Sequence, residues 1–319
     1  MRDRYLFLFR IALGAALFIG IIVWVGSEGI IARLSNLDWP WLILMPVLWI
    51  INLIAISIGL YALLGKGANL SVVDFFRCVF ISSSLGAFLP LQIGESSLVL
   101  LLKQQGVPLT KSVSLFITDK IITLSVLWIF GSIGLYFIVY KHVAVLWVGL
   151  GTPAFLIIVA VIIIRLINAE SGKLREYLQL KALRFVYDHT QILLKEMLSN
   201  RSGMAINAIF TAARMLLIQP VMYFICFKAC GTHIPMASLI LISNILTAVS
   251  LIPITAQGLG VVEISAVYLF SLIHVNESTT VAIYLISRPL YFIFSGLILL
   301  FTGGLWDMVH RRDRFYKNS

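Results

Sequence analysis

Seven ionisable side chains lie within stretches of this sequence that are otherwise apolar enough for a lipid bilayer. Each costs roughly 2.5 to 3.5 kcal/mol at the bilayer centre, so most must be paired or solvated. They could form structural ion pairs between helices, or they could line a polar cavity for a charged substrate. The count favours a cavity, because four cations accompany only three carboxylates. The candidate substrate-binding residues are Arg77, Glu95, Asp119, Lys120, Arg214, Glu263 and Arg288.

Four of these residues belong to a repeated motif. Glu95 is followed by Lys120 after 25 residues, and Glu263 is followed by Arg288 after the same interval. Each glutamate comes after a break rich in proline and glycine, which interrupts a helix and exposes helix ends and backbone N–H groups suited to anions. The predicted hairpin turns contain Pro90 and Gly94 in the first copy, and Pro253, Gly258 and Gly260 in the second.

The composition predicts the environment of this motif. Of 319 residues, 60% are hydrophobic and 12% are charged, and the mean hydropathy is +1.01. Such a chain has too little polar surface for a soluble globule, so we expect an all-α polytopic membrane protein. The net charge of +10 is interpreted as a cytoplasmic collar rather than a nucleic-acid surface. The three cysteines, Cys78, Cys226 and Cys230, suit neither a disulfide framework nor a zinc site and are predicted to be packing residues.

Hydropathy predicts six full spans and two broken segments. Each broken segment has a second arm of about eight to twelve residues, where a span needs roughly 17 to 25. We therefore expect two re-entrant helical hairpins, 75–103 and 238–274; the alternative is that both cross fully and give eight to ten spans. The six full spans are predicted at 5–26, 39–64, 112–140, 143–167, 204–227 and 279–305.

The basic residues predict an orientation. With the N-terminus in the cytoplasm, seventeen Lys and Arg residues lie inside, three outside and four within membrane segments. The chain then divides into two repeats of opposite orientation, 1–140 and 141–305, with both termini cytoplasmic. An amphipathic linker over 168–203 and a basic tail over 306–319 complete the cytoplasmic face. Transporters built this way bind substrate near the midplane, between broken helices.

Catalytic motifs do not emerge from the sequence. No nucleophile and base pair, P-loop or metal-binding pattern is recognisable, so we expect neither an enzyme nor a cofactor. The leading hypothesis is a translocator whose charged cavity takes a phosphate-bearing lipid headgroup. Two alternatives remain open: an intramembrane lipid-modifying transferase, and a non-transporting accessory protein for envelope lipid or glycolipid synthesis.

Two signatures also resemble a known family. LIPITAQGLGVVE followed by LISRPLYF, and FLPLQIGESSLVLLLKQQGV followed by FITDK, look like the signature regions of the lysylphosphatidylglycerol synthase transmembrane-region family of flippase-like integral membrane proteins. The family often has an arginine where this chain has Leu98. Some members carry a soluble aminoacyl-transferase domain, and we expect a stand-alone member without it.

The resemblance implies a multi-pass protein of the cytoplasmic membrane that translocates lipid. Its expected partner is an anionic or aminoacylated phospholipid, or a lipid-linked sugar, with envelope-synthesis enzymes as further partners. The resemblance carries Pro90, Gly94, Glu95, Asp119 and Lys120 of the first signature over to the family's motif. From the second signature it carries over Pro253, Gly258, Gly260, Glu263 and Arg288.

Overall fold

The protein is a helical bundle in which all regular structure of the described residues is helical. The computed structural model describes residues 2–65, 70–89, 93–140, 199–252 and 254–303. Its helices are α1 (Arg2–Val25), α2 (Ser27–Ser35), α3 (Trp39–Leu42), α4 (Leu44–Leu64), α5 (Val72–Phe88), α6 (Ile93–Gln104), α7 (Leu109–Gly134), α11 (Arg201–Ala213), α12 (Gln219–Ala229), α13 (Met236–Ser250), α14 (Val261–Ser271) and α15 (Glu277–Phe301).

Apolar helices of membrane-spanning length confirm the predicted all-α polytopic class. In the described part of the chain, four stretches are long and apolar enough to cross a membrane, or five if one bent pair counts as a span. The bent pair, Phe9–Val25 with Ser27–Ser35, turns by 89° where Gly26 adopts a left-handed φ of 89°. The predicted span 143–167 lies outside the described residues. The four stretches are Trp39–Leu64, Leu109–Val139, Arg201–Ala229 and Glu277–Phe301.

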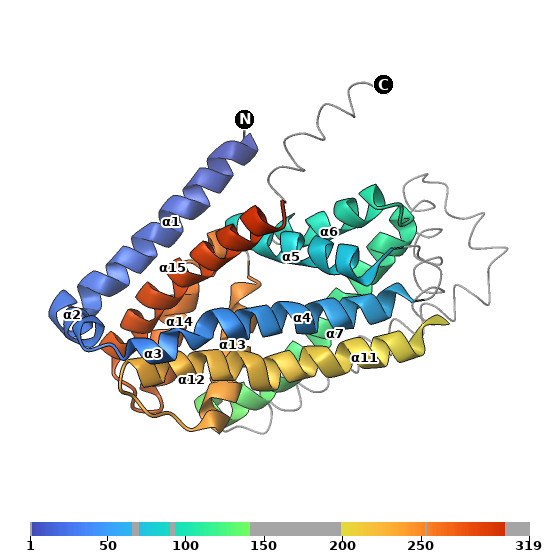
Figure 1. Ribbon diagram of the computed structural model, residues 1–319. Helices are drawn as coiled ribbons and strands as arrows, with labels where there is room; N and C mark the ends of the chain where they lie inside the picture. The colour runs from blue at the N-terminus through green and yellow to red at the C-terminus, as the bar shows by residue number, and fades with distance from the viewer. Residues whose placement is uncertain (1, 66–69, 90–92, 141–198, 253, 304–319) are drawn as a thin grey trace, which may run out of the picture.

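Two long antiparallel elements, α4 and the pair α11 and α12, lie side by side in the bundle (Figure 1). They are fastened at both ends. The amide of Asn200 donates to the carbonyl of Ala62 at 2.9 Å, and the Asp38 N–H donates to the carbonyl of Ala229 at 2.9 Å. Between α11 and α12 the helix widens into a π-helical segment, Arg214–Ile218, just before Pro220. A proline has no N–H to donate to the preceding turn, which favours such a local change of register.

Both broken segments are helical hairpins. In the first, α5 packs against α6, and in the second, α13 packs against α14. The second arms are short, 12 residues in α6 and 11 in α14, as predicted. The α5–α6 hairpin starts at the end of the bundle where α4 ends, and the α13–α14 hairpin starts at the opposite end (Figure 1). Their re-entry into a membrane stays a prediction, because the bundle carries no bilayer.

The two halves also exchange contacts in matching pairs. The last helix of the first half, α7, packs against α13 of the second hairpin. In the same way α15, the last described helix of the second half, packs against α5 of the first hairpin. This reciprocity is what two repeats related by a twofold axis would produce. The opposite membrane orientation of the repeats stays a prediction.

The core contains several apolar clusters, of which the largest joins α12, α13, α14 and α15. All three cysteines are buried and none forms a disulfide, as expected for packing residues. Most of the predicted linker and the whole tail lie outside the described residues, as do Pro90 and Pro253. The linker's predicted end at residue 203 differs from the structure, since α11 already begins at Arg201, where Asn200 caps it by accepting from the Gly203 N–H.

Candidate functional site

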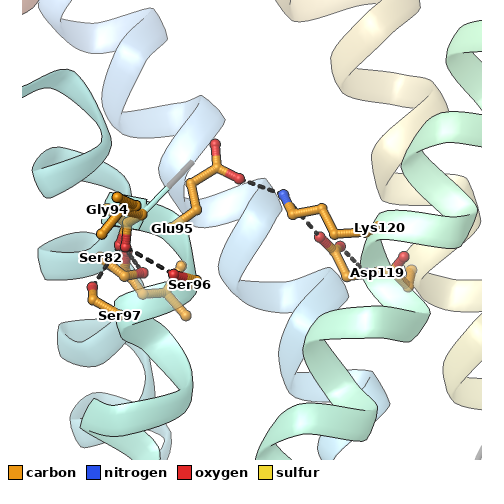
Figure 2. Close-up of polar contacts among 10 residues, drawn as sticks. Ser82, Gly94, Glu95, Ser96, Ser97, Asp119 and Lys120 are labelled. Carbon is orange, nitrogen blue, oxygen red and sulfur yellow. Dashed lines mark hydrogen bonds and ion pairs between the residues drawn. The ribbon is translucent and has the colours of Figure 1, made fainter. Parts of the chain in front are cut away.

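The first motif forms an open charged cluster between α6 and α7. Glu95 lies in the first turn of α6 and forms an ion pair with Lys120, which projects from the middle of α7. Figure 2 shows the Lys120 ammonium lying between Glu95 and Asp119, whose carboxylate oxygen is 3.8 Å from Nζ. The pair is accessible, because 44% of the Glu95 side chain and 24% of the Lys120 side chain are exposed.

A neighbouring amide anchors the second carboxylate of this cluster. Asn207 on α11 donates from Nδ2 to Oδ1 of Asp119 at 3.1 Å. Asn207 is itself 2% exposed, and this partly buried hydrogen bond joins the two halves of the chain. The anchor fixes one oxygen of Asp119 and leaves the other facing Lys120.

The second motif forms a closed ion pair. Glu263 lies in the first turn of α14, at the same position as Glu95 in α6. Its Oε1 accepts from Nε of Arg288 at 2.7 Å, and its Oε2 accepts from the Gly260 N–H at 2.6 Å. Only 1% of the Glu263 side chain is exposed. Both carboxylate oxygens therefore have partners, and Glu263 caps the start of its own helix by accepting from the Gly260 N–H.

Gln257 joins the two hairpin breaks. Its side-chain amide donates to the carbonyl of Leu89 at 2.7 Å and also to the carbonyl of Gly86, both at the end of α5. Its own backbone carbonyl accepts from Arg288 at 3.2 Å. Gln257 has a left-handed φ of 55°, which a non-glycine residue rarely adopts. One residue thus contacts the first hairpin through its side chain and the second ion pair through its backbone.

A cavity of about 580 Å³ opens beside the first ion pair. All four charges of the open cluster, including Arg214 on the π-helical segment, line it. Its wall also includes hydroxyl and amide side chains from both halves of the chain. Its lining residues include Ser82, Ser83, Glu95, Asp119, Lys120, Thr123, Arg214, Gln219, Thr247, Ser250, Thr255, Gln257 and Tyr291.

A second cavity, of about 320 Å³, adjoins the first. It contains Arg288 and three tyrosines, two of which, Tyr223 and Tyr284, share a hydroxyl–hydroxyl hydrogen bond of 3.0 Å. Helix α4 contributes Met45 to this cavity but Ile56 to the larger one, so the two follow one another along the bundle. The residues common to both walls are Thr247, Ser250, Gln257 and Tyr291.

Arg214 is the cation with unused hydrogen-bonding capacity. Its Nε is buried, and no residue of the described chain forms a hydrogen bond with it. A buried donor without a partner is costly, so such a group is suited to an acceptor that the protein itself does not provide. Gln219 and Thr255, which line the same cavity, also have buried oxygens without a partner in the described part of the chain.

Arg77 lies away from both cavities. It donates from Nε to the carbonyl of Thr302 at 2.7 Å, at the end of α15. Without Arg77, the walls of the two cavities still carry three cations, Lys120, Arg214 and Arg288, and two carboxylates, Glu95 and Asp119. The third carboxylate, Glu263, lines neither cavity and is buried against Arg288. The exposure of the first ion pair and the free Nε of Arg214 support a binding cavity independently of this count.

The glycines of the motif serve close packing. Gly94 lies in the first turn of α6 rather than in the turn before it, and a Cβ there would overlap the backbone of Gly86 on α5. Gly258 and Gly260 lie in the break before α14, both with left-handed φ values. A Cβ on Gly260 would also collide with Leu17 of α1, so this break is packed under the first helix.

Sequence reasoning missed several uncharged residues of the site, notably Asn207, Gln219, Gln257 and Tyr291. Gln257 could have been found as the only amide side chain within the second break, where the sequence favours a tight turn. Asn207, Arg214 and Gln219 lie on one predicted span, with Arg214 seven and Gln219 twelve residues after Asn207. These intervals alone do not show what the polar side chains contact. In the described residues, no group of His, Cys, Asp and Glu could hold a metal ion.

The fold and the site define a class of protein before any comparison: a multi-pass helical membrane protein with two broken hairpins around charged internal cavities. The chain belongs to the family described as the lysylphosphatidylglycerol synthase TM region, whose model matches residues 11–298. No protein in a search of curated sequences matches the chain. Membership confirms the predicted family and is consistent with a lipid-related role in a membrane.

Proposed function

We propose that this protein translocates a phosphate-bearing lipid headgroup across the cytoplasmic membrane through the larger cavity. The observation that carries the proposal is the combination of four charges and unsatisfied donors and acceptors on one accessible wall, within a family of lipid-related membrane domains. A cavity of this size is adequate for a headgroup but small for whole acyl chains. The chains would therefore remain in the surrounding bilayer while the headgroup crosses.

The cations and the carboxylates of the cavity would bind different groups of the headgroup. Arg214 and Lys120 would bind the phosphate, since a guanidinium and an ammonium both form charge-assisted hydrogen bonds with phosphate oxygens. Glu95 and Asp119 would balance these cations, or accept an amine where the headgroup carries one. Because two cations and two carboxylates face the cavity, it suits a zwitterionic or aminoacylated headgroup as well as an anionic one.

The protein's contribution is to replace water around the headgroup during the crossing. A phosphate in the hydrocarbon layer would lose its hydration, and the fixed charges and hydroxyl groups of the cavity substitute for it. The open ion pair is suited to this exchange. Lys120 can leave Glu95 for the phosphate while Glu95 stays partly solvated, because 44% of its side chain is exposed.

The proposal is tested in liposomes that contain the purified protein and a fluorescent phospholipid. A membrane-impermeant quencher, added outside, measures how fast the probe moves from the inner to the outer leaflet. Phosphatidylglycerol and phosphatidylethanolamine probes are compared. We expect the protein to accelerate exchange of at least one probe, and Arg214→Gln to slow it by roughly tenfold or more, the effect of losing a charged hydrogen bond. Lys103→Gln, a matched change at an exposed residue of α6, should not alter the rate.

Equal rates for Arg214→Gln and the unaltered protein would contradict the assignment of this cavity. Failure of the protein to move any probe would contradict translocation itself. A modified lipid that forms only when a donor substrate is supplied would instead identify an intramembrane transferase. The proposal that the protein is not an enzyme would then be overturned.

A further inference from the structure

Gln257 lies on the wall that the two cavities share. Four residues line both cavities, and of these Gln257 alone also holds the breaks of the two hairpins together. Its amide reaches the carbonyls of Gly86 and Leu89, so the side chain extends from the second break to the first. Loss of these hydrogen bonds would separate the hairpin tips at the level where the cavities meet.

The two cavities also lie one after the other along the length of the bundle. Helix α12 contributes Gln219 to the larger cavity and Cys226 to the smaller one, two helical turns further along. Each cavity has a cation suited to a phosphate, Arg214 in the larger and Arg288 in the smaller. A headgroup leaving the larger cavity along the bundle would therefore meet Gln257 before it reached Arg288.

We infer that the Gln257 side chain is the closed partition between two stations for the same phosphate headgroup. This inference rests on the proposed function for the identity of the ligand, but the partition itself can be tested without transport. Gln257 is a positioning residue: its hydrogen bonds hold the hairpin tips in contact, and breaking them opens the passage. The left-handed backbone at Gln257, together with its contact to Arg288, keeps the side chain aimed at the first hairpin.

A native cysteine provides the test. Cys226 lines the smaller cavity, and Cys78 is buried in the apolar core of the first hairpin. Two reporter proteins are prepared, each retaining one of these cysteines and carrying alanine at the other two cysteine positions. A small charged methanethiosulfonate is applied in liposomes from the face on which Lys103 lies. The rate of cysteine modification is then measured by mass spectrometry.

The informative variant is Gln257→Gly. Glycine adopts a left-handed φ readily, so this change removes the side chain without adding backbone strain. We expect Cys226 to react roughly tenfold faster or more, the change expected for losing two partly buried hydrogen bonds, while Cys78 remains unreactive. Gln257→Glu retains the side-chain length, replaces the donating amide and should also accelerate the reaction of Cys226. Gln105→Gly, a matched change in an exposed turn, should have no effect.

The partition is overturned if Gln257→Gly and Gln257→Glu leave the reaction of Cys226 unchanged, or if Cys78 reacts as fast as Cys226. The second result would show a general loosening of the fold. The outcome is independent of the liposome transport assay. Faster reaction of Cys226 without any lipid translocation would keep the partition and reject the proposed lipid function.

Discussion

The two halves of this protein carry the same pair of charges in two different states. Glu95 and Glu263 occupy equivalent positions in the first turns of α6 and α14, and each meets a cation 25 residues later. The Glu263 side chain is 1% exposed and both its oxygens have partners, whereas 44% of the Glu95 side chain is exposed. The same motif thus gives a closed ion pair in one half and an accessible ion pair in the other.

The difference arises from what packs over each pair. The second break is covered by α1, whose Gly14 and Leu17 approach Leu259 and Gly260 closely. The first break borders the larger cavity, and the Glu95 side chain beside it is 44% exposed. The packing of distant helices can therefore leave one copy of a motif closed and the other open. Four predictions test this division.

The largest expected effect concerns the opposite entry of the two hairpins. Cysteines introduced at Gln105 and at Asn276, in a chain whose own cysteines are replaced by alanine, should be labelled by an impermeant reagent from opposite faces only. Gln105 should react from the cytoplasm, because most Lys and Arg residues are predicted on that side. Labelling of both positions from one face would remove the inverted relation between the halves.

The closed pair should contribute more to stability than the open one. Arg288→Gln leaves Glu263 buried with one oxygen unpaired, and we expect it to lower the free energy of unfolding by roughly 3 to 5 kcal/mol. Lys120→Gln leaves Glu95 partly solvated and should cost about 1 kcal/mol or less. The two variants are compared by heating each in detergent and measuring the remaining folded protein by size-exclusion chromatography.

Removing both charges of the closed pair provides the control for this comparison. Combining Glu263→Gln with Arg288→Gln should recover part of the lost stability, because no buried charge then lacks a partner. Equal destabilisation by Arg288→Gln and Lys120→Gln would show that the two pairs do not differ in the way their burial indicates.

The next largest effect is expected from the close packing of the two arms of the first hairpin, α5 and α6. Gly94→Ala places a methyl group against the backbone of Gly86, and we expect a loss of roughly 1 to 3 kcal/mol from overpacking. Gly131→Ala is the matched control, since nothing lies within 4 Å of a Cβ added at Gly131. The same thermal assay measures both. A Gly94→Ala protein as stable as the control would mean that the arms are not packed as described.

Salt should produce the smallest effect, and only at the open pair. Raising the ionic strength from about 0.1 M to about 1 M shortens the screening length from about 10 Å to about 3 Å. We therefore expect the stability difference between the unaltered protein and Lys120→Gln to shrink by a few tenths of a kcal/mol, within the worth of a partly exposed ion pair. The difference for Arg288→Gln should not change with salt. A salt-dependent closed pair would contradict its burial.

The sequence by itself determined the helical membrane class and the equal spacing of the two charge pairs. The span predicted at 39–64 agrees with the apolar stretch Trp39–Leu64, because hydropathy and helix length are local properties of the chain. The cost of unpaired charge in an apolar segment made ion pairs one of two interpretations of these residues, and the structure pairs Glu95 with Lys120 and Glu263 with Arg288. The hairpins followed from proline and glycine, whose backbone effects are also local.

Only the tertiary structure decided which charges are accessible. The sequence placed Arg77 with the other cations, but in the folded chain it contacts Thr302 at the end of α15. It gave no sign that Asn207 anchors Asp119, or that Gln257 joins the two breaks, since these contacts span 88 and 168 or more residues of chain. Burial depends on the helices that pack over each residue, and distant segments supply them. The sequence therefore shows that the motif occurs twice. It does not show that the two copies differ in exposure, because this difference follows from the packing of α1 over the second copy.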